Sequence, residues 1–439
     1  MKGKNLLILV VVAGVLVGLA VLTSRKQKRH AVVATEIGKP VLAALQDPDT
    51  LNSIERIEVL SPGGTVTVAR VEGAWVAPRK YNYPADFGKV RDFVRTLRDL
   101  EIGHTLKGGA AERRELELLT PGGAATNGIG TVVKLETAAG EEVASLLVGK
   151  EHERAAPADS PYARYGAYPD GRYILAGEKP VLVADTLSAL PSDVKDWFDT
   201  TVVNVSSYDI TNITVTGANG TTLTFQRPEP GGDLVVADLN EDTEEMETAA
   251  AGGLANALSY LNFQDIADPS LSDEALGFDD PVKLIARTKE NKVYTLTIGG
   301  SPEDSDNRYV RVSAAYEPPA EPAPAPGEDD VETPETEPGT NVTAAATADV
   351  EAEKAEDEAR KKRREEQEKR AGEVEALNER VGPWTYVVNS YKVDDVTADR
   401  SAFVKAKEEE EEEEVEDEDA PPADTGTETA DEPSEPISE

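Results

Sequence analysis

Hydrophobic and polar positions alternate in short runs over most of the chain, a pattern typical of strands in antiparallel sheets. In residues 65–70 and 222–227, apolar side chains recur at every second position. Each run follows a turn signal, at residues 62–64 (Pro-Gly-Gly) and 219–220 (Asn-Gly). Asn-Gly between alternating runs is a strong hairpin signal. We therefore expect an α+β protein built on mainly antiparallel sheets.

This strand pattern occurs twice. The strands expected in the first copy are residues 57–60, 65–70, those around Trp75, 131–135, 143–148, 162–164 and 173–175. Their expected counterparts in the second copy are residues 213–216, 222–227, 234–236, 282–286, 293–298, 309–311 and 386–388. The step from Arg164 to Tyr173 is then a short turn, whereas its counterpart runs from Arg311 to Tyr386. The intervening charged stretch is an insertion in one hairpin, which closure entropy tolerates because it grows slowly with length.

An amphipathic helix is expected between the third and fourth strands of each copy. The first begins at Pro84 and presents an apolar stripe of Phe87, Val90, Val94, Leu97 and Leu100. The second presents Met246, Leu254, Leu258 and Leu261, and is weakened by Gly252 and Gly253. A linking helix over residues 187–198 is expected to carry Trp197 and Phe198 into a core.

An unbroken apolar run covers residues 6–22, between Lys2 and Lys4 on one side and a basic cluster at residues 25–29 on the other. As a helix it would span about 25 Å, close to a hydrocarbon core of about 30 Å. A cleaved signal peptide is the alternative, but residues 20–24 lack small residues in the order that cleavage requires. We therefore expect a single-pass bacterial inner-membrane protein. The flanking charges favour a cytoplasmic body, whereas an anchor with a short leading segment usually exports the rest of the chain; we expect a periplasmic body.

The formal charge of −39 is concentrated in two segments. Residues 317–349 contain no Lys or Arg, and residues 408–414 are seven consecutive glutamates that open an acidic tail. Such segments bury too little apolar surface to fold and are expected to be disordered. The charge argues against a nucleic-acid partner and against a body lying flat on anionic lipid.

Residues 351–381 are rich in Ala, Glu, Lys and Arg with opposite charges four residues apart, which predicts a solvated helix. Apolar spacing is confined to its end, at Val374, Leu377 and Val381. A coiled coil with a partner helix is the less favoured alternative, because a sustained coiled coil needs apolar residues over several heptads.

We predict no catalytic, cofactor-binding or metal-binding residue. The chain has no Cys, which excludes disulfides, thiolate nucleophiles and Cys-based zinc sites. Its histidines, His30, His104 and His152, lack metal-ligand spacing. Gly128-Ile129-Gly130 lacks the third glycine of a dinucleotide motif, and no nucleophile elbow or phosphate loop occurs. Aromatic residues for a sugar platform are scarce: the clusters are Tyr81 with Tyr83 and Tyr162 with Tyr165 and Tyr168, and the second is expected to pack a hairpin rather than to stack on a ligand.

The chain divides into five expected segments. These are an anchor with its basic flank (1–30), a first α+β repeat (50–205), a second repeat (206–316 with 382–404), an acidic and charged-helix insertion (317–381) and a disordered acidic tail (405–439).

Several motifs resemble a bacterial membrane-anchored family catalogued as domain of unknown function 4340, in two tandem copies. They are residues 54–59, 73–75 (Gly-Ala-Trp), 276–281 (Leu-Gly-Phe-Asp-Asp-Pro) and 293–299. The resemblance covers roughly residues 50–316 and 384–403; the first copy has residues 118–123 where the Leu-Gly-Phe stretch would stand. It implies no catalytic residues, and an accessory role beside ABC-type transporter components.

The leading hypothesis is a membrane-anchored, non-enzymatic accessory or scaffold protein with protein partners in a transporter or envelope complex. Two alternatives stay open. One is an envelope glycan hydrolase using a carboxylate pair. The other is an extracytoplasmic ligand-binding module, which requires a concave pocket between the two copies.

Overall fold

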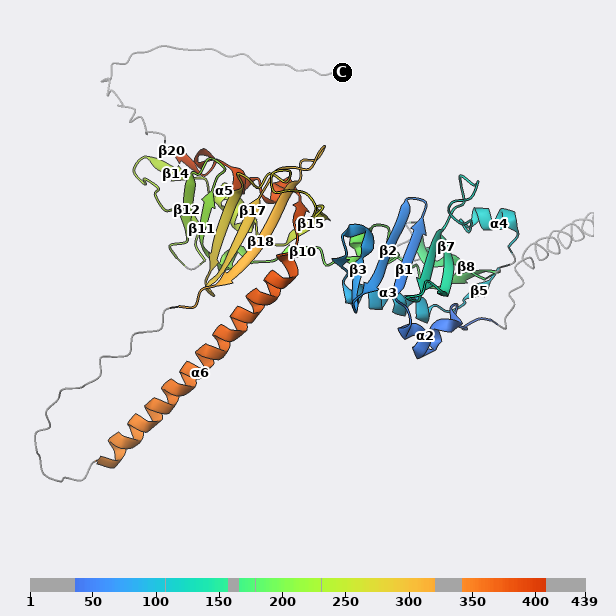
Figure 1. Cartoon of the computed structure of the whole chain (residues 1–439), viewed down its shortest axis with the longest axis horizontal. Coiled ribbons are helices and arrows are strands. Elements are labelled where there is room, and N and C mark those ends of the chain that lie inside the picture. The colour runs from blue at the N-terminus through green and yellow to red at the C-terminus, as the bar shows by residue number, and fades with distance from the viewer. Residues whose placement is uncertain are drawn as a thin grey trace, which may run out of the picture.

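Two nine-stranded antiparallel sheets lie end to end and are accompanied by few helices (Figure 1). The computed structural model describes residues 36–106, 108–156, 166–177, 179–229, 231–319 and 342–407. The expected α+β class with antiparallel sheets is confirmed. Within these ranges no helix is both long and apolar enough to cross a bilayer. The apolar run at residues 6–22, the segment 320–341 and the tail from residue 408 lie outside the described residues.

The first sheet has the strand order β4-β3-β2-β1-β6-β7-β8-β9-β5. Its strands are β1 Arg56–Ser61, β2 Gly64–Val71, β3 Ala74–Ala77, β4 Tyr83–Pro84, β5 His104–Thr105, β6 Thr131–Glu136, β7 Glu142–Ala155, β8 Ala167–Ala176 and β9 Lys179–Val183. Helix α3 (Phe87–Asp99) packs on it through Val90, Phe93 and Leu97, whose side chains are at most 5% exposed.

The second sheet has the strand order β10-β15-β19-β18-β17-β16-β11-β12-β13. Its strands are β10 Thr201–Val203, β11 Ile210–Thr216, β12 Thr222–Gln226, β13 Val235–Val236, β15 Leu261–Ile266, β16 Val282–Thr288, β17 Lys292–Ile298, β18 Arg308–Tyr316 and β19 Tyr386–Val388. Strand β19 pairs with β18 in spite of the long stretch between them, with Tyr386 opposite Val310.

Eight strands of the two sheets follow the same order, β3-β2-β1-β6-β7-β8-β9-β5 in one and β13-β12-β11-β16-β17-β18-β19-β15 in the other. This order makes β8 the counterpart of β18, so the expected equivalence of Tyr173 with Tyr386 is wrong: Tyr173 lies in β8, whose counterpart holds Tyr309. The expected turn before Tyr173 is also wrong, because Pro169 to Gly171 lie within β8. Residues 162–164 lie outside the described residues. The inserted stretch therefore occupies the turn between β18 and β19, which corresponds to the turn after β8.

A turn with the same pattern of hydrogen bonds lies before β6 and before β16, and it places residues 116–118, rather than the expected 118–123, at the position of the Leu-Gly-Phe stretch. Gly277 has φ of +71° and its counterpart Glu117 has φ of +57°. The backbone hydrogen bonds around them match: Leu118 N to Arg113 O (2.7 Å) and Lys150 N to Leu116 O (3.1 Å) in one, Phe278 N to Asp273 O (2.8 Å) and Gly300 N to Leu276 O (2.8 Å) in the other. A left-handed residue in such a turn ends a helix. The two turns differ in the residue that takes the left-handed conformation, which is glutamate in the first turn and glycine in the second.

Glu117→Gly is expected to raise the free energy of unfolding by about 1 kcal/mol, because a non-glycine residue is strained in the left-handed region. Chemical denaturation of the two proteins measures the change. The control is Glu115→Gly in the preceding helix α4 (Ala110–Glu115), which is expected to lower stability by about 0.5–1 kcal/mol. A loss of stability in Glu117→Gly would contradict this interpretation of the turn.

The helices differ from expectation in their ends and exposed sides. Helix α3 begins after Asp86, whose carboxylate accepts a hydrogen bond from the Gly88 amide (2.7 Å), and not at Pro84, which lies in β4. Phe87 is 63% exposed, so the core stripe includes Phe93 instead. The helix expected over residues 187–198 is limited to one 3-10 turn, η4 (Val194–Trp197). Trp197 and Phe198 are nevertheless each 2% exposed, as expected.

Helix α5 (Thr248–Asn256) is shorter than expected, since Met246 lies in β14 and Leu261 in β15. Gly253 in α5 allows a close approach: a Cβ there would lie 1.7 Å from the Asp395 carboxylate. The remaining short elements are η1 Ala43–Gln46, α2 Pro48–Asn52, η2 Pro78–Lys80, η5 Ser207–Asp209, β14 Glu244–Met246, η6 Ser390–Lys392, η7 Asp395–Thr397, η8 Arg400–Ala402 and β20 Val404–Ala406. Strand β14 pairs with β20.

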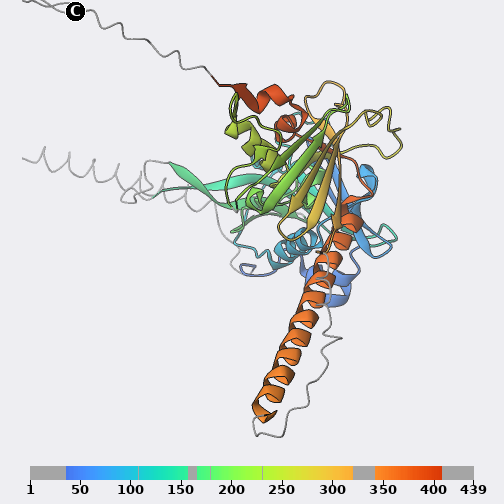
Figure 2. The same cartoon turned by 90° about the vertical axis from the view of Figure 1, so that its left-hand side faces the viewer.

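Helix α6 (Val342–Val381) is longer than the predicted 351–381 and contains 40 residues, about 60 Å at 1.5 Å per residue. The C-terminal end of α6 lies against the second sheet, and the helix projects from there away from both sheets, as Figures 1 and 2 show from two sides. Side chains from Asp357 to Glu366 are all exposed. The prediction of a solvated helix is in line with this burial pattern.

Candidate functional site: the junction of the sheets and the base of helix α6

Aromatic side chains from distant parts of the chain meet where the two sheets join. Tyr83, on edge strand β4 of the first sheet, is 5% exposed. Its ring centroid lies 4.8 Å from Phe198, 5.4 Å from Phe263 and 4.9 Å from Trp384, with edge-to-face geometry in each case. Such pairs stabilise beyond their buried area. The junction is therefore part of one hydrophobic core that extends through both sheets.

Burial governs the chemistry of the two tyrosines at this junction. It raises the pKa of Tyr83 and that of Tyr386, whose rings lie 6.4 Å apart. The two hydroxyl groups interact with each other in this buried environment. Both phenols therefore stay neutral and act as packing groups.

Polar contacts fix the two sheets relative to each other. Lys80 Nζ lies 2.6 and 2.7 Å from the two carboxylate oxygens of Asp265 on β15. The Asp86 amide donates to the Trp197 carbonyl (2.7 Å), and Lys89 Nζ donates to the Phe198 carbonyl (2.8 Å). These bonds tie both ends of the first turn of α3 to the linker between the sheets.

A cleft of about 830 Å³ opens beside this junction, between α3, residues 188–197 and strand β15. Its apolar wall includes Phe93, Trp197 and Phe263, and its polar wall includes Lys89, Lys195, Asp92, Asp196, Asn262 and Gln264. The volume falls in the range of small-molecule sites.

The carboxylates of the cleft are engaged in structural contacts. Asp196 accepts hydrogen bonds from the amides of Ser192 (2.8 Å) and Asp193 (2.9 Å). The Arg91 guanidinium lowers the pKa of Asp92 by a hydrogen bond. A glycosidase acid requires a raised pKa, which Asp92 does not have. No cluster of potential metal ligands occurs among the described residues. The two acids of the cleft therefore already have hydrogen-bond partners.

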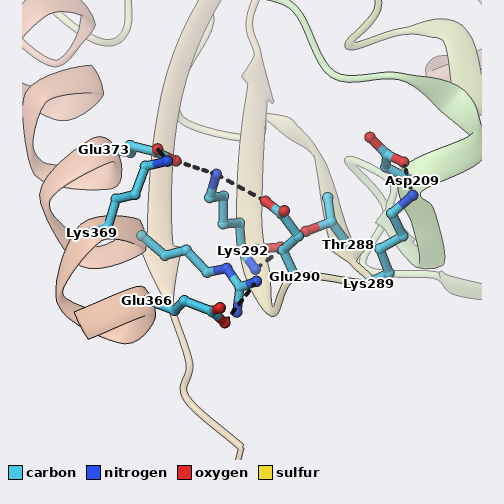
Figure 3. Close-up of polar contacts among 9 residues, drawn as sticks. Asp209, Thr288, Lys289, Glu290, Lys292, Glu366, Lys369 and Glu373 are labelled. Carbon is cyan, nitrogen blue, oxygen red and sulfur yellow. Dashed lines mark hydrogen bonds and ion pairs between the residues drawn. The ribbon is translucent and has the colours of Figure 1, made fainter. Parts of the chain in front are cut away.

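The base of α6 is the second notable site, and Figure 3 shows its polar contacts with strand β17. Lys292 Nζ lies 2.6 Å from Glu373 on the helix and 3.1 Å from Glu290. Burial opposes the charge of Lys292, but the hydrogen bonds with Glu373 and Glu290 outweigh it and raise the lysine pKa. Lys292 in turn lowers the pKa of Glu373. The pair therefore stays charged and bridges the helix to the sheet.

Further contacts hold the last turns of α6. The Asn378 amide group donates to the Ala314 carbonyl and accepts from its amide, both at 2.8 Å. Arg380 donates to the carbonyls of Thr201 (2.7 Å) and Val202 (2.8 Å). Val381 is fully buried. The described bonds thus fix the C-terminal end of the helix to β17, β18 and β10.

Asn378→Ala is expected to weaken this base by about 2 kcal/mol, because it removes two hydrogen bonds and leaves the half-buried amide and carbonyl of Ala314 without these partners. Amide hydrogen exchange in the last two turns of α6 should accelerate by roughly 30-fold, the equivalent of that free energy. The matched control is Glu368→Ala, on the exposed side of the same helix. Equal exchange in both variants would contradict a structural role for Asn378.

The residues singled out in the sequence do not assemble into a site. His104 is exposed in β5, and His152 in β7 contacts the Asp170 carboxylate, which also pairs with Arg154. Gly130 is structural, since a Cβ there would lie 2.4 Å from the Glu117 carbonyl. Tyr168 is 43% exposed in β8. His30, Tyr162 and Tyr165 lie outside the described residues.

The sequence did not reveal the convergence of Tyr83, Phe198, Phe263 and Trp384. Isolated aromatics carry no pairing signal, and only the packing of the two sheets brings them together. The contacts at the base of α6 also depend on tertiary placement, and the apolar spacing at Val374, Leu377 and Val381 was considered only as a weak coiled-coil signal.

Residues 75–281 match the family described as Domain of unknown function (DUF4340). The match confirms the family resemblance. It is one continuous stretch that begins in β3 and crosses into the second sheet, so two tandem copies of the family domain are not confirmed. No curated protein and no solved structure matches the chain.

Proposed function

From a chain that carries a DUF4340 domain, we propose a single-pass inner-membrane accessory or scaffold protein without catalytic activity. Its two-sheet body lies in the periplasm and acts beside an ABC-type transporter or another envelope complex. Helix α6 is the arm that contacts the partner. The single observation that carries this proposal is a 40-residue helix whose described bonds to the body lie in its last turns.

The charge pattern of α6 supports a role outside the body. Between Asp357 and Glu366 every side chain is exposed, and opposite charges lie one turn apart, as in the pair of Lys361 with Glu365. These pairs support the helix without any contact to the sheets. A helix that needs no packing partner of its own is available to a protein partner, including through coiled-coil contacts.

Co-purification in mild detergent tests the scaffold proposal. The tagged full chain is expected to bring down a membrane complex. Deletion of residues 343–363 shortens α6 by about 31 Å and keeps its base, and this variant is expected to lose the complex. Deletion of residues 412–432 from the tail removes the same number of residues and is expected to retain it. A lone monomer for the full chain, or equal recovery with the shortened helix, would count against the arm.

The anchor and its orientation need a separate test. Residues 6–22 support the anchor, and a reporter fused after Glu439 reports the side of the membrane. We expect the periplasmic signal. A cytoplasmic signal would show that the flanking basic residues determine the topology.

We also infer that the two sheets descend from one duplicated module. The shared order of eight strands and the matching turns at Glu117 and Gly277 support this inference. In this account the arm was acquired by insertion into the turn between β18 and β19.

A ligand-binding module is the second candidate, and the cleft of about 830 Å³ at the junction favours it. Lys195→Ala with Asn262→Ala, two polar positions of the cleft, would abolish binding of a small polar ligand. A library screen by thermal shift of the full chain, repeated on this variant, tests it. A stabilising compound that acts equally on both proteins would place the ligand elsewhere. No observation favours the hydrolase.

A further inference from the structure

A second groove, of about 560 Å³, runs along the opposite side of α3, between this helix, α2 and the β2–β3 hairpin. Its floor is apolar, with Ile54, Trp75, Val90 and Val94 among its lining residues. Four arginines complete the lining, which contains no acidic residue: Arg70, Arg91, Arg95 and Arg98. An apolar floor bordered by cations fits an amphiphilic anionic surface.

The groove residues of α3 form a stripe along the helix. Phe87, Arg91, Arg95 and Arg98 recur at spacings of four, four and three residues, so they share one side. Phe87 is 63% exposed at one end of the stripe. Cationic side chains next to an exposed aromatic ring are typical of helices at a membrane interface.

Three of the arginines pair with acidic residues that do not line the groove. Arg91 pairs with its neighbour Asp92 (2.9 Å), and Arg98 pairs with Asp99 (2.8 Å). Arg70 lies 3.3 Å from Glu55. Exposed pairs of this kind contribute little to stability. The guanidinium groups therefore stay available to phosphate, which Arg binds in bidentate geometry.

The described chain begins beside the C-terminal end of α3, the helix that forms one wall of the groove. The Val41 amide donates to the Leu100 carbonyl, and the Gly38 amide donates to the Ile102 carbonyl, both at 2.8 Å. Residues 38–41 therefore run beside the C-terminal end of α3. The 13 residues between Leu22 and Glu36 reach at most about 45 Å. An anchor at residues 6–22 would keep this groove close to the bilayer.

We propose that the α3 groove is the face that the body sets against anionic phospholipid headgroups. This inference rests on the proposed anchor. The charge of this face differs from the net charge of −39, because the lining of the groove carries four arginines and no acidic residue. The expectation that the body avoids anionic lipid was based on the net charge of the whole chain, and the charge of this face has the opposite sign. The acidic tail is the poorer occupant, since it has almost no apolar residue to fill the floor.

Fluorescence quenching in lipid nanodiscs tests the inference with the full chain. The chain has no Cys, so an Asn52→Cys variant places a single label in the groove, where Asn52 is exposed. A Tyr208→Cys variant places the control label on the second sheet, at a side chain 74% exposed. The discs carry a headgroup quencher and consist of phosphatidylcholine with or without phosphatidylglycerol. Quenching is expected for the Asn52 label alone, only with phosphatidylglycerol, and reduced by added salt.

Charge variants identify the groups responsible. Arg91→Gln with Arg95→Gln and Arg98→Gln is expected to lower the ratio of docked to undocked chains by about 100-fold, roughly five-fold per arginine. The matched control, Lys361→Gln with Arg363→Gln and Arg364→Gln, removes the same charge from exposed positions of α6 and is expected to change nothing. Circular dichroism confirms that both variants are folded.

The outcomes separate this inference from the proposed anchor. A chain that does not enter the discs overturns the anchor and the docking together. A chain that enters but keeps the Asn52 label unquenched overturns the docking alone. A label shielded equally in both kinds of disc, and released on deletion of residues 408–439, would assign the groove to the acidic tail and overturn the inference.

Discussion

Tyr83→Ala is expected to lower the free energy of unfolding by about 3–5 kcal/mol, the cost of removing a large buried aromatic side chain. Tyr83 is 5% exposed. Its ring contacts Phe198 in the linker, Phe263 in strand β15 and Trp384, which precedes strand β19. The cavity would form where the two sheets meet. Chemical denaturation followed by tryptophan fluorescence measures the loss, because Trp384 belongs to the cluster.

The control for this variant is Tyr208→Ala, which removes the same side chain from a position 74% exposed. Its expected effect is within about 0.5 kcal/mol. Similar values for the two variants would mean that the sheets do not depend on the aromatic junction. A Tyr83→Ala protein in which the sheets unfold in separate transitions would show that the junction couples them.

Gly299→Ala is expected to cost about 3 kcal/mol, at the upper end of the range for overpacking. A Cβ at this position would lie 2.4 Å from the Leu276 carbonyl oxygen. The obstacle is backbone, so no side-chain rotation relieves it. The clash would disturb the hydrogen bond from the Gly300 amide to Leu276 (2.8 Å), which joins the turn at Gly277 to the sheet. Urea denaturation measures the change.

Gly252→Ala provides the contrast. Gly252 lies in α5, and a Cβ there would meet nothing within 4 Å. Alanine is the better helix former, so this variant is expected to gain about 0.5–1 kcal/mol. Destabilisation by both substitutions would show that the close approach at Gly299 is not the cause of the loss.

The strands of the fold were predictable because their signals are local. Alternating residues and turn residues indicated β1 with β2 and β11 with β12, and both hairpins are present. The assignment of β8 and β9 failed for a physical reason: β7 and β8 continue past the sheet as a long hairpin through Pro169 and Gly171, which the sequence marks as a turn. Pairing of β19 with β18 across the insertion was predicted from the comparison of the two copies.

The candidate sites were less predictable because they depend on packing between distant segments. Only the apolar stripe of α3 was predicted. Arg91, Arg95 and Arg98 stand four and three residues apart in the sequence, but they were not recognised as a second stripe. Helix α3 begins only after Asp86 and buries Val90, Phe93 and Leu97, so that Phe87 lies on its exposed side beside the arginines. The turn at Glu117 was missed because glutamate rarely occupies a left-handed position, so its sequence contained no glycine signal.

The distance between a spin label on α6 and one on the body tests the central claim most directly, namely that the arm is held in a fixed direction by its base. Lys362→Cys and Tyr208→Cys place the two labels at exposed positions of the Cys-free chain. The account predicts one narrow distance distribution, broadened by Asn378→Ala. A broad distribution in the labelled chain that keeps Asn378 would contradict it, because a loosely attached helix cannot hold a partner in a fixed position relative to the body.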